Sequence, residues 1–135
     1  MKKILVIIEK GLDGKYSAYT PNLKTTVLNG QGNSVDEAVC DMKVSLKEVV
    51  ETYQDSDDKV PDEISEPVEF IYKYDVQSLF NYFDEINITA FSQKVGINAS
   101  LLRQYKNGLS FASDRQIEKI KRGLHELGSR LISIR

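Results

Sequence analysis

The spacing of apolar residues in the first half of the chain predicts a small β-sheet. Residues 3–10 form a short apolar, β-branched run, and a glycine-containing turn separates them from the alternating residues 16–20, so the two stretches are expected to pair as a hairpin. Residues 25–28 are expected to form a third strand, followed by a flexible segment at 30–33. Both alternating sets of the first strand are apolar, so neither face of the sheet can be left wholly to water.

Helical spacing begins at Ser34. Its side chain can accept a hydrogen bond from the Glu37 backbone while the Glu37 side chain reaches back, which is the pattern of a capping box. Cys40 lies off the apolar face and is expected to be a partly exposed bystander. The apolar residues recur every three or four positions and form one stripe: Val35, Val39, Met42, Leu46, Val49 and Tyr53.

An acidic segment follows at residues 54–67. It contains two prolines and few apolar residues, so a loop is expected there, whereas residues 68–73 alternate as a fourth strand. The order is then β-β-β-α-β, in which a single helix covers one face of the sheet. The open face is expected to meet another copy of the chain or a partner protein.

Two short amphipathic helices joined by a turn are predicted between residues 87 and 108. Ser92 is small where the helices must approach each other, Gly96 can adopt the positive φ of a tight turn, and Asn98 can cap the second helix. This is the spacing of a helix-turn-helix, although ordinary helical hairpins that never touch nucleic acid share it. The apolar positions that define the two helices are Phe91, Val95, Ile97, Leu102 and Tyr105.

A further helix is predicted on each side of this pair. Asp75 can cap the first, and Ser113 opens a second capping box. Residues 131–135 could finish the last helix or form a short strand, and either form exposes apolar groups suited to a dimer contact. The apolar positions are Val76, Leu79, Phe80, Phe83 and Ile86 in the first helix, and Ile117, Ile120, Leu124, Leu127 and Leu131 in the last.

The second helix of the pair carries the candidate base-reading groups. Its polar face lies opposite Leu102 and Tyr105, where side chains could reach base edges in a major groove. Arg103 and Gln104 are the strongest candidates for base contacts. The residues placed to meet the phosphate backbone are Thr89, Lys94 and Lys106. The full candidate set for DNA binding is Thr89, Lys94, Asn98, Ala99, Ser100, Arg103, Gln104, Lys106 and Asn107.

Composition and charge narrow the possible functions. The chain has 135 residues, one cysteine and one histidine, so an internal disulfide is impossible and no metal or cofactor is expected. Residues 1–75 carry nine basic against fifteen acidic side chains, a balance of −6, whereas residues 76–135 carry nine against five, or +4. A basic half suits DNA and an acidic half suits a basic protein. No stretch has the length of a membrane span or a signal peptide, so a cytoplasmic protein is expected.

Two groups of residues resemble known families. The segments QKVGIN and LLRQYKNG resemble the Cro/repressor type of helix-turn-helix domain. The glycine-turn hairpin followed by YTPNL and by SVDEAV, ahead of such a domain, resembles HicB-type antitoxins. The chain differs from their usual pattern after Leu23, where Lys24, Thr25 and Thr26 replace a common Pro-Gly-Cys turn.

The resemblance implies a fold and a set of partners. The expected fold class is α+β: a partial RNase H-like domain at residues 1–74 followed by an all-α helix-turn-helix domain at 75–135. The first domain would bind and occlude a small basic HicA toxin that cleaves mRNA, and the second would bind operator DNA as a homodimer or higher oligomer and repress its own operon. The candidate toxin-binding residues are Tyr19, Pro21, Asn22, Leu23, Lys24, Thr25 and Thr26.

Three functions remain open at this point. The first is an antitoxin and autorepressor without enzymatic activity. The second is a degraded RNase H that still acts on nucleic acid; two-metal cleavage needs converging carboxylates, usually with one in the middle of the first strand, and residues 3–8 contain none. The third is a stand-alone helix-turn-helix regulator whose N-terminal domain binds a ligand or a protein.

Overall fold

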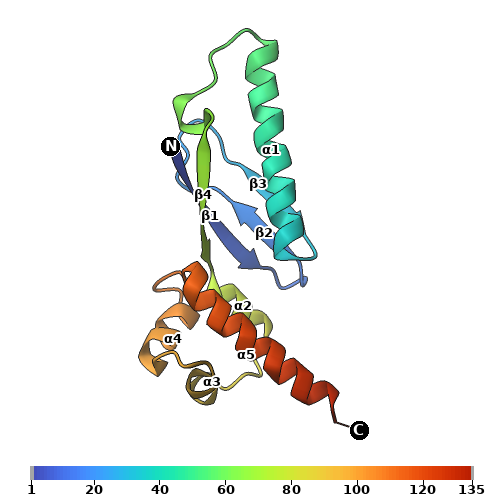
Figure 1. Cartoon of the computed structure of the whole chain (residues 1–135), viewed down its shortest axis with the longest axis vertical. Helices are drawn as coiled ribbons and strands as arrows, with labels where there is room; N and C mark the ends of the chain where they lie inside the picture. Colours follow the sequence, from blue (N-terminus) through green and yellow to red (C-terminus); the bar gives the residue numbers. More distant parts are fainter. Residues whose placement is uncertain (1, 135) are drawn as a thin grey trace. The chain divides into compact units, whose positions relative to one another are not determined.

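The computed structural model describes residues 2–134 and has an α+β fold with a four-stranded mixed sheet and five α-helices. The chain divides into two compact units, Met1–Lys73 and Tyr74–Arg135, which are described separately below (Figure 1). The boundary lies one residue before the expected one. No helix within residues 2–134 combines the length and the apolar character needed to cross a bilayer.

The sheet has the strand order β3-β2-β1-β4. Its strands are β1 (Lys2–Lys10), β2 (Tyr16–Tyr19), β3 (Asn29–Gly32) and β4 (Val68–Tyr74). β1 and β2 form the predicted antiparallel hairpin, and β2 pairs antiparallel with β3. β1 therefore lies inside the sheet, with a neighbouring strand on each side, as its continuous apolar sequence requires.

The third strand does not lie where the sequence predicted it. Residues 25–28 are irregular, and Asn29–Gly32, which overlaps the segment expected to be flexible, forms β3. A Cβ atom on Gly30 would lie 2.2 Å from the Met42 backbone nitrogen and 2.3 Å from the Ala38 carbonyl oxygen, both in the helix that packs on the sheet. Only glycine permits the backbones of β3 and the helix to approach this closely. Gly30 is therefore a packing requirement of the strand and not a sign of a flexible segment.

That helix is α1 (Val35–Asp55), which lies along β2 and β3 (Figure 1). The predicted cap is confirmed, since Ser34 Oγ accepts from the Glu37 N–H at 3.1 Å. The Glu37 carboxylate also reaches back, but it accepts from the N–H of Asn33, one residue before the cap, at 2.7 Å. Met42 and Leu46 of the predicted stripe are buried. Ala38, which the stripe omitted, is buried with them because it faces Gly30.

The acidic segment is not a featureless loop. α1 extends to Asp55, and a short 3₁₀ helix, η1 (Asp62–Ile64), follows it. Ile64 is 1% exposed, so it anchors η1 in the core. The Lys2 ammonium group donates to the Asp62 carbonyl at 2.6 Å and holds the same turn from β1. One apolar residue in an acidic stretch was too weak a signal to predict this packing.

β1 is buried on both of its faces. Ile4, Val6, Ile7 and Ile8 are each 3% exposed or less. Alternate residues of a strand point to opposite faces, so the chain covers Ile4, Val6 and Ile8 on one face and Ile7 on the other. Leu5, on the same face as Ile7, is only half-buried, and the expectation that a second copy or a partner protein covers the open face stays a prediction.

The second unit contains four helices: α2 (Val76–Tyr82), α3 (Ile88–Val95), α4 (Ala99–Lys106) and α5 (Asp114–Ile132). The predicted caps are present at Asp75, Asn98 and Ser113, whose side chains accept from backbone N–H groups of the first turns. α2 is shorter than predicted, since Phe83 and Ile86 follow it and pack against the core from the connection to α3.

Gly123 fixes the distance between α3 and α5. A Cβ atom at this position would lie 2.2 Å from Val95 Cγ1 and 3.1 Å from Phe91 Cζ, whereas a Cβ at Gly128 would meet nothing within 4 Å. The prediction that both glycines only weaken the last helix is therefore incomplete. Gly123 allows α3 and α5 to pack closely. Gly128 has no such role and only lowers the helix propensity of α5.

The end of α5 is helical and exposed. The helix includes Leu131 and Ile132, so the helical alternative is correct and the strand alternative is wrong, while Arg135 lies outside the described residues. Leu131, Ile132 and Ile134 are 57%, 84% and 73% exposed. This apolar group is the surface expected to take part in a dimer contact.

Alanine substitutions at the two glycines of α5 test the packing directly. Gly123→Ala is expected to destabilise the chain by about 1–2 kcal/mol, because overpacking costs about 1–3 kcal/mol and helix propensity returns up to about 1. Gly128→Ala, the matched control, is expected to stabilise it by about 0.5–1 kcal/mol. Urea unfolding of both variants is the measurement, and equal shifts of the same sign would contradict the assignment of Gly123.

Candidate functional site

The turn between α3 and α4 packs together the two helices that carry most of the predicted DNA-binding residues. Gly96 has a φ of 73°, as predicted for the turn, and Ser92, 2% exposed, lies at the helix crossing. The Gly96 and Ile97 N–H groups both donate to the Ser92 carbonyl, at 3.1 and 3.3 Å. Asn98 caps α4 by accepting from the Ser100 N–H at 2.9 Å. The connection is therefore held by backbone and capping bonds.

Leu102 and Tyr105 are buried, so the opposite face of α4 points to solvent. Ala99 is half-buried. The other eight residues of the candidate set are exposed: Thr89, Lys94, Asn98, Ser100, Arg103, Gln104, Lys106 and Asn107. Three of them are cations, which gives this surface the positive charge that phosphate contacts require.

Arg103 and Thr89 are coupled across the two helices. An Arg103 guanidinium nitrogen donates to Thr89 Oγ1 at 2.9 Å. The sequence assigned Arg103 to base contacts and Thr89 to the phosphate backbone, fourteen positions apart, and no local pattern predicts their bond. The hydrogen bond limits the directions in which the guanidinium points and leaves its other donors available.

The candidate toxin-binding residues form a loop that is closed at its neck. Thr20, which is fully buried, donates its N–H to the Leu28 carbonyl at 3.1 Å, and its hydroxyl accepts from the Leu28 N–H at 2.8 Å. Residues 21–27 therefore leave and re-enter the domain at one point, as in an Ω-loop. Pro21, Asn22, Lys24 and Thr25 are exposed in it, Leu23 and Thr26 are half-buried, and Tyr19 precedes it at the end of β2.

Glu63 of η1 holds the tip of this loop. Its carboxylate accepts from the Lys24 N–H at 3.1 Å, from the Thr25 N–H at 2.9 Å and from the Thr25 hydroxyl. The Thr25 hydroxyl, followed by the Thr25 and Lys24 amides, lowers the pKa of Glu63 below its ordinary value of 4.5. The sequence did not predict this contact, because thirty-eight positions and an apparently irregular segment separate the partners.

Tyr19 and Glu9 form another contact beside the loop. The Tyr19 hydroxyl donates to the Glu9 carboxylate at 2.9 Å. Glu9, which lies near the end of β1, is thus held by a hydrogen bond within the fold. Within residues 2–134, no group of three or more His, Cys, Asp or Glu side chains is arranged to hold a metal ion.

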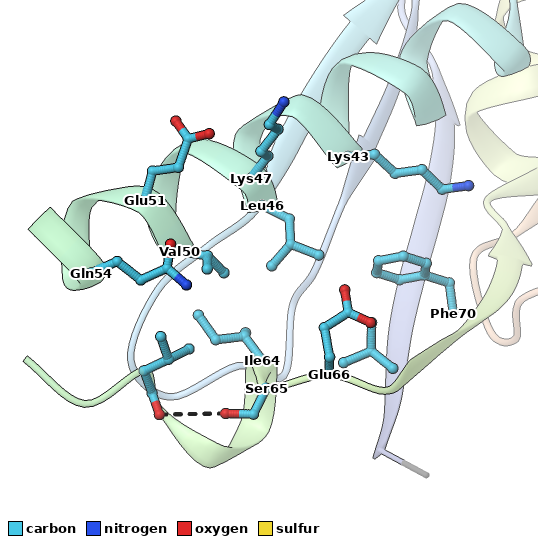
Figure 2. A pocket seen from close by; sticks show the side chains of 12 residues that line it. Lys43, Leu46, Lys47, Val50, Glu51, Gln54, Ile64, Ser65, Glu66 and Phe70 are labelled. Carbon is cyan, nitrogen blue, oxygen red and sulfur yellow. Dashed lines mark hydrogen bonds between the residues drawn. The ribbon is translucent and has the colours of Figure 1, made fainter.

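A groove of about 870 Å³ lies between α1 and the segment from η1 to β4 (Figure 2). Leu46, Ile64 and Phe70 are among its apolar lining residues, and the Lys43 ammonium lies 5.9 Å from the Phe70 ring centroid. None of the predicted site residues lines it. η1 joins the groove to the loop, since Ile64 lines the groove and the preceding Glu63 holds residues 24 and 25.

No protein-family model, curated protein sequence or solved structure matches this chain. Its function is therefore inferred from the chemistry and geometry of its own residues.

The tie between Glu63 and the loop predicts an acid-sensitive loop. Because folding lowers the Glu63 pKa, its contribution is complete above the unfolded value of 4.5 and is lost as pH falls through the lower folded value. Thr25→Val, which removes the hydroxyl and keeps the amide, is expected to raise the Glu63 pKa, whereas Thr25→Ser is expected to leave it low. An NMR titration of the Glu63 carboxyl measures both, and an unchanged pKa in the valine variant would contradict the contact.

Proposed function

We propose that the chain is a HicB-type antitoxin that neutralises a HicA-type mRNA-cleaving toxin and represses its own operon by binding operator DNA. In this proposal the first unit is the truncated RNase H-like, toxin-binding domain, and the second is the helix-turn-helix domain. The observation that carries it is the α3–turn–α4 segment, whose cap at Asn98, glycine turn and exposed polar face meet the requirements of a major-groove reader.

Charge supports DNA as the partner of the second unit. Residues 76–135 have a balance of +4, and Lys94, Arg103 and Lys106 are exposed on α3 and α4. An exposed arginine can bind guanine through two hydrogen bonds, and a glutamine such as Gln104 can bind adenine in the same way. Arg103 lies near the middle of α4. Because α4 is short, the whole helix can lie in the major groove.

Charge also supports a basic protein as the partner of the first unit. Residues 1–75 have a balance of −6, which would repel phosphate and attract a basic toxin. The loop at 21–27 is exposed and held at both neck and tip, so a partner could bind it without first ordering it. A non-catalytic role follows from this proposal, in which the chain blocks the toxin by covering it.

Self-association completes the proposal. A repressor of this type reads two half-sites only when two copies are held together. Leu131, Ile132 and Ile134 supply an exposed apolar surface on the unit that carries the DNA-binding residues. We therefore assign the homodimer contact to the end of α5.

Arg103 and Lys106 are expected to fail in different ways. Arg103→Ala should abolish discrimination between operator and scrambled DNA while weak binding remains, since a bidentate base contact is worth about 1–3 kcal/mol. Lys106→Ala should weaken binding to both duplexes in parallel and reduce the salt slope by about one unit. Titrations of both duplexes at two salt concentrations measure this, and undiminished operator preference in Arg103→Ala would remove that residue from the base contacts.

The toxin-binding role is tested by adding a positive charge to the loop. Asn22→Arg is expected to weaken binding of the small basic protein encoded by the neighbouring gene by at least about tenfold, because like charges at an interface cost several kcal/mol. Gln54→Arg, which adds the same charge at the end of α1, is the control. Co-expression and calorimetry provide the readouts. A chain that binds operator DNA while the neighbouring product neither binds it nor is neutralised would instead favour a stand-alone regulator.

A further inference from the structure

Glu63 is half-buried and is held in an unusual position. It belongs to η1, which Ile64 anchors in the core and the Lys2 ammonium holds through the Asp62 carbonyl. The Ser65 hydroxyl donates to the Pro61 carbonyl at 2.9 Å and tightens the same turn. The Glu63 backbone is therefore fixed, and its carboxylate reaches out from a rigid support.

The carboxylate meets three donors on two consecutive residues. These are the N–H groups of Lys24 and Thr25 and the Thr25 hydroxyl. Successive backbone N–H groups that point in one direction fix the local φ and ψ angles, because the chain must turn to present both. An ionised acceptor makes such bonds stronger than a neutral one. Glu63 therefore selects one conformation at the tip of the loop.

The neck of the loop depends on different residues. Thr20 and Leu28 close it through buried hydrogen bonds that do not involve Glu63. Loss of the Glu63 carboxylate would consequently free the tip while the sheet and the neck remain intact. Glu63 is half-buried and does not belong to the buried core, so its replacement is expected to leave the core in place.

We infer that Glu63 is the positioning residue of the partner-binding loop, holding residues 24 and 25 in the conformation that a basic protein partner binds. The inference rests on the proposed toxin-binding role of this loop. Glu63 itself makes its bonds to the loop, so its effect on the partner is exerted through Lys24 and Thr25. A positioning residue changes the fraction of molecules in which the loop has the binding conformation. A residue in direct contact with the partner changes the dissociation rate of the complex.

This difference gives a kinetic test. If the ordered loop is populated only one time in about ten without Glu63, the association rate falls about tenfold and the apparent Kd rises by the same factor. The dissociation rate stays the same, because the bound loop is identical. Loss of a direct contact appears mainly in the dissociation rate.

The experiment compares the full-length wild type with Glu63→Gln and Glu48→Gln. Glu48 is an exposed glutamate of α1, so its variant measures how much association slows through the loss of one negative charge alone. The probe is the purified toxin-like product of the neighbouring gene, carrying a substitution that abolishes RNA cleavage. Stopped-flow or surface binding gives both rates, and NMR gives the hydrogen-exchange rates of the Lys24 and Thr25 amides without any partner.

We expect Glu63→Gln to expose the Lys24 and Thr25 amides to faster exchange and to slow association about tenfold, with dissociation unchanged and only a small fall in melting temperature. Thr25→Val, which removes the hydroxyl donor from the other side, should also speed exchange, in the same direction. Unchanged exchange in both variants, or an association rate equal to that of Glu48→Gln, would overturn the inference. A wild-type chain that does not bind the toxin would overturn the proposed function instead, and the exchange rates would still decide whether Glu63 orders the loop.

Discussion

The contact between the α1 backbone and Gly30 decides the architecture of the first unit. Because no side chain separates the two backbones at this point, the helix lies against β3 and the third strand must be the glycine-rich segment Asn29–Gly32. The preceding residues are then excluded from the sheet. They become a loop whose ends meet at Thr20 and Leu28, and whose tip needs support from elsewhere. The exposed loop follows from the way the helix packs.

Local signals in the sequence were sufficient for the elements that depend on neighbouring residues. The caps at Ser34, Asn98 and Ser113, the turn at Gly96 and the hairpin of β1 and β2 were all predicted and are present. Glycine misled at two positions. A glycine in a flexible segment and a glycine at a close packing contact look the same in the sequence. Only the position of the helix that packs against it distinguishes the two cases.

The candidate sites divide in the same way. The exposed face of α4 could be predicted from the spacing of Leu102 and Tyr105, because helical periodicity alone determines which side chains point outward. The hydrogen-bond partner of each important polar group could not be predicted in this way. Thr89 for Arg103 and Glu63 for Thr25 come from other elements, and a bond between elements depends on tertiary packing that no local pattern records.

Both candidate binding surfaces share one physical property. In each, a side chain from a neighbouring element orders a group that would otherwise rotate freely: Thr89 holds the Arg103 guanidinium, and Glu63 holds the backbone at Thr25. An unrestrained arginine or loop loses conformational entropy on binding, and that loss reduces affinity. When these groups are already ordered in the free protein, part of the entropy loss occurs during folding and not during binding. The packing of the two cores offsets it there. In the proposed function, each surface is thus ordered for its partner by a hydrogen bond within its own unit.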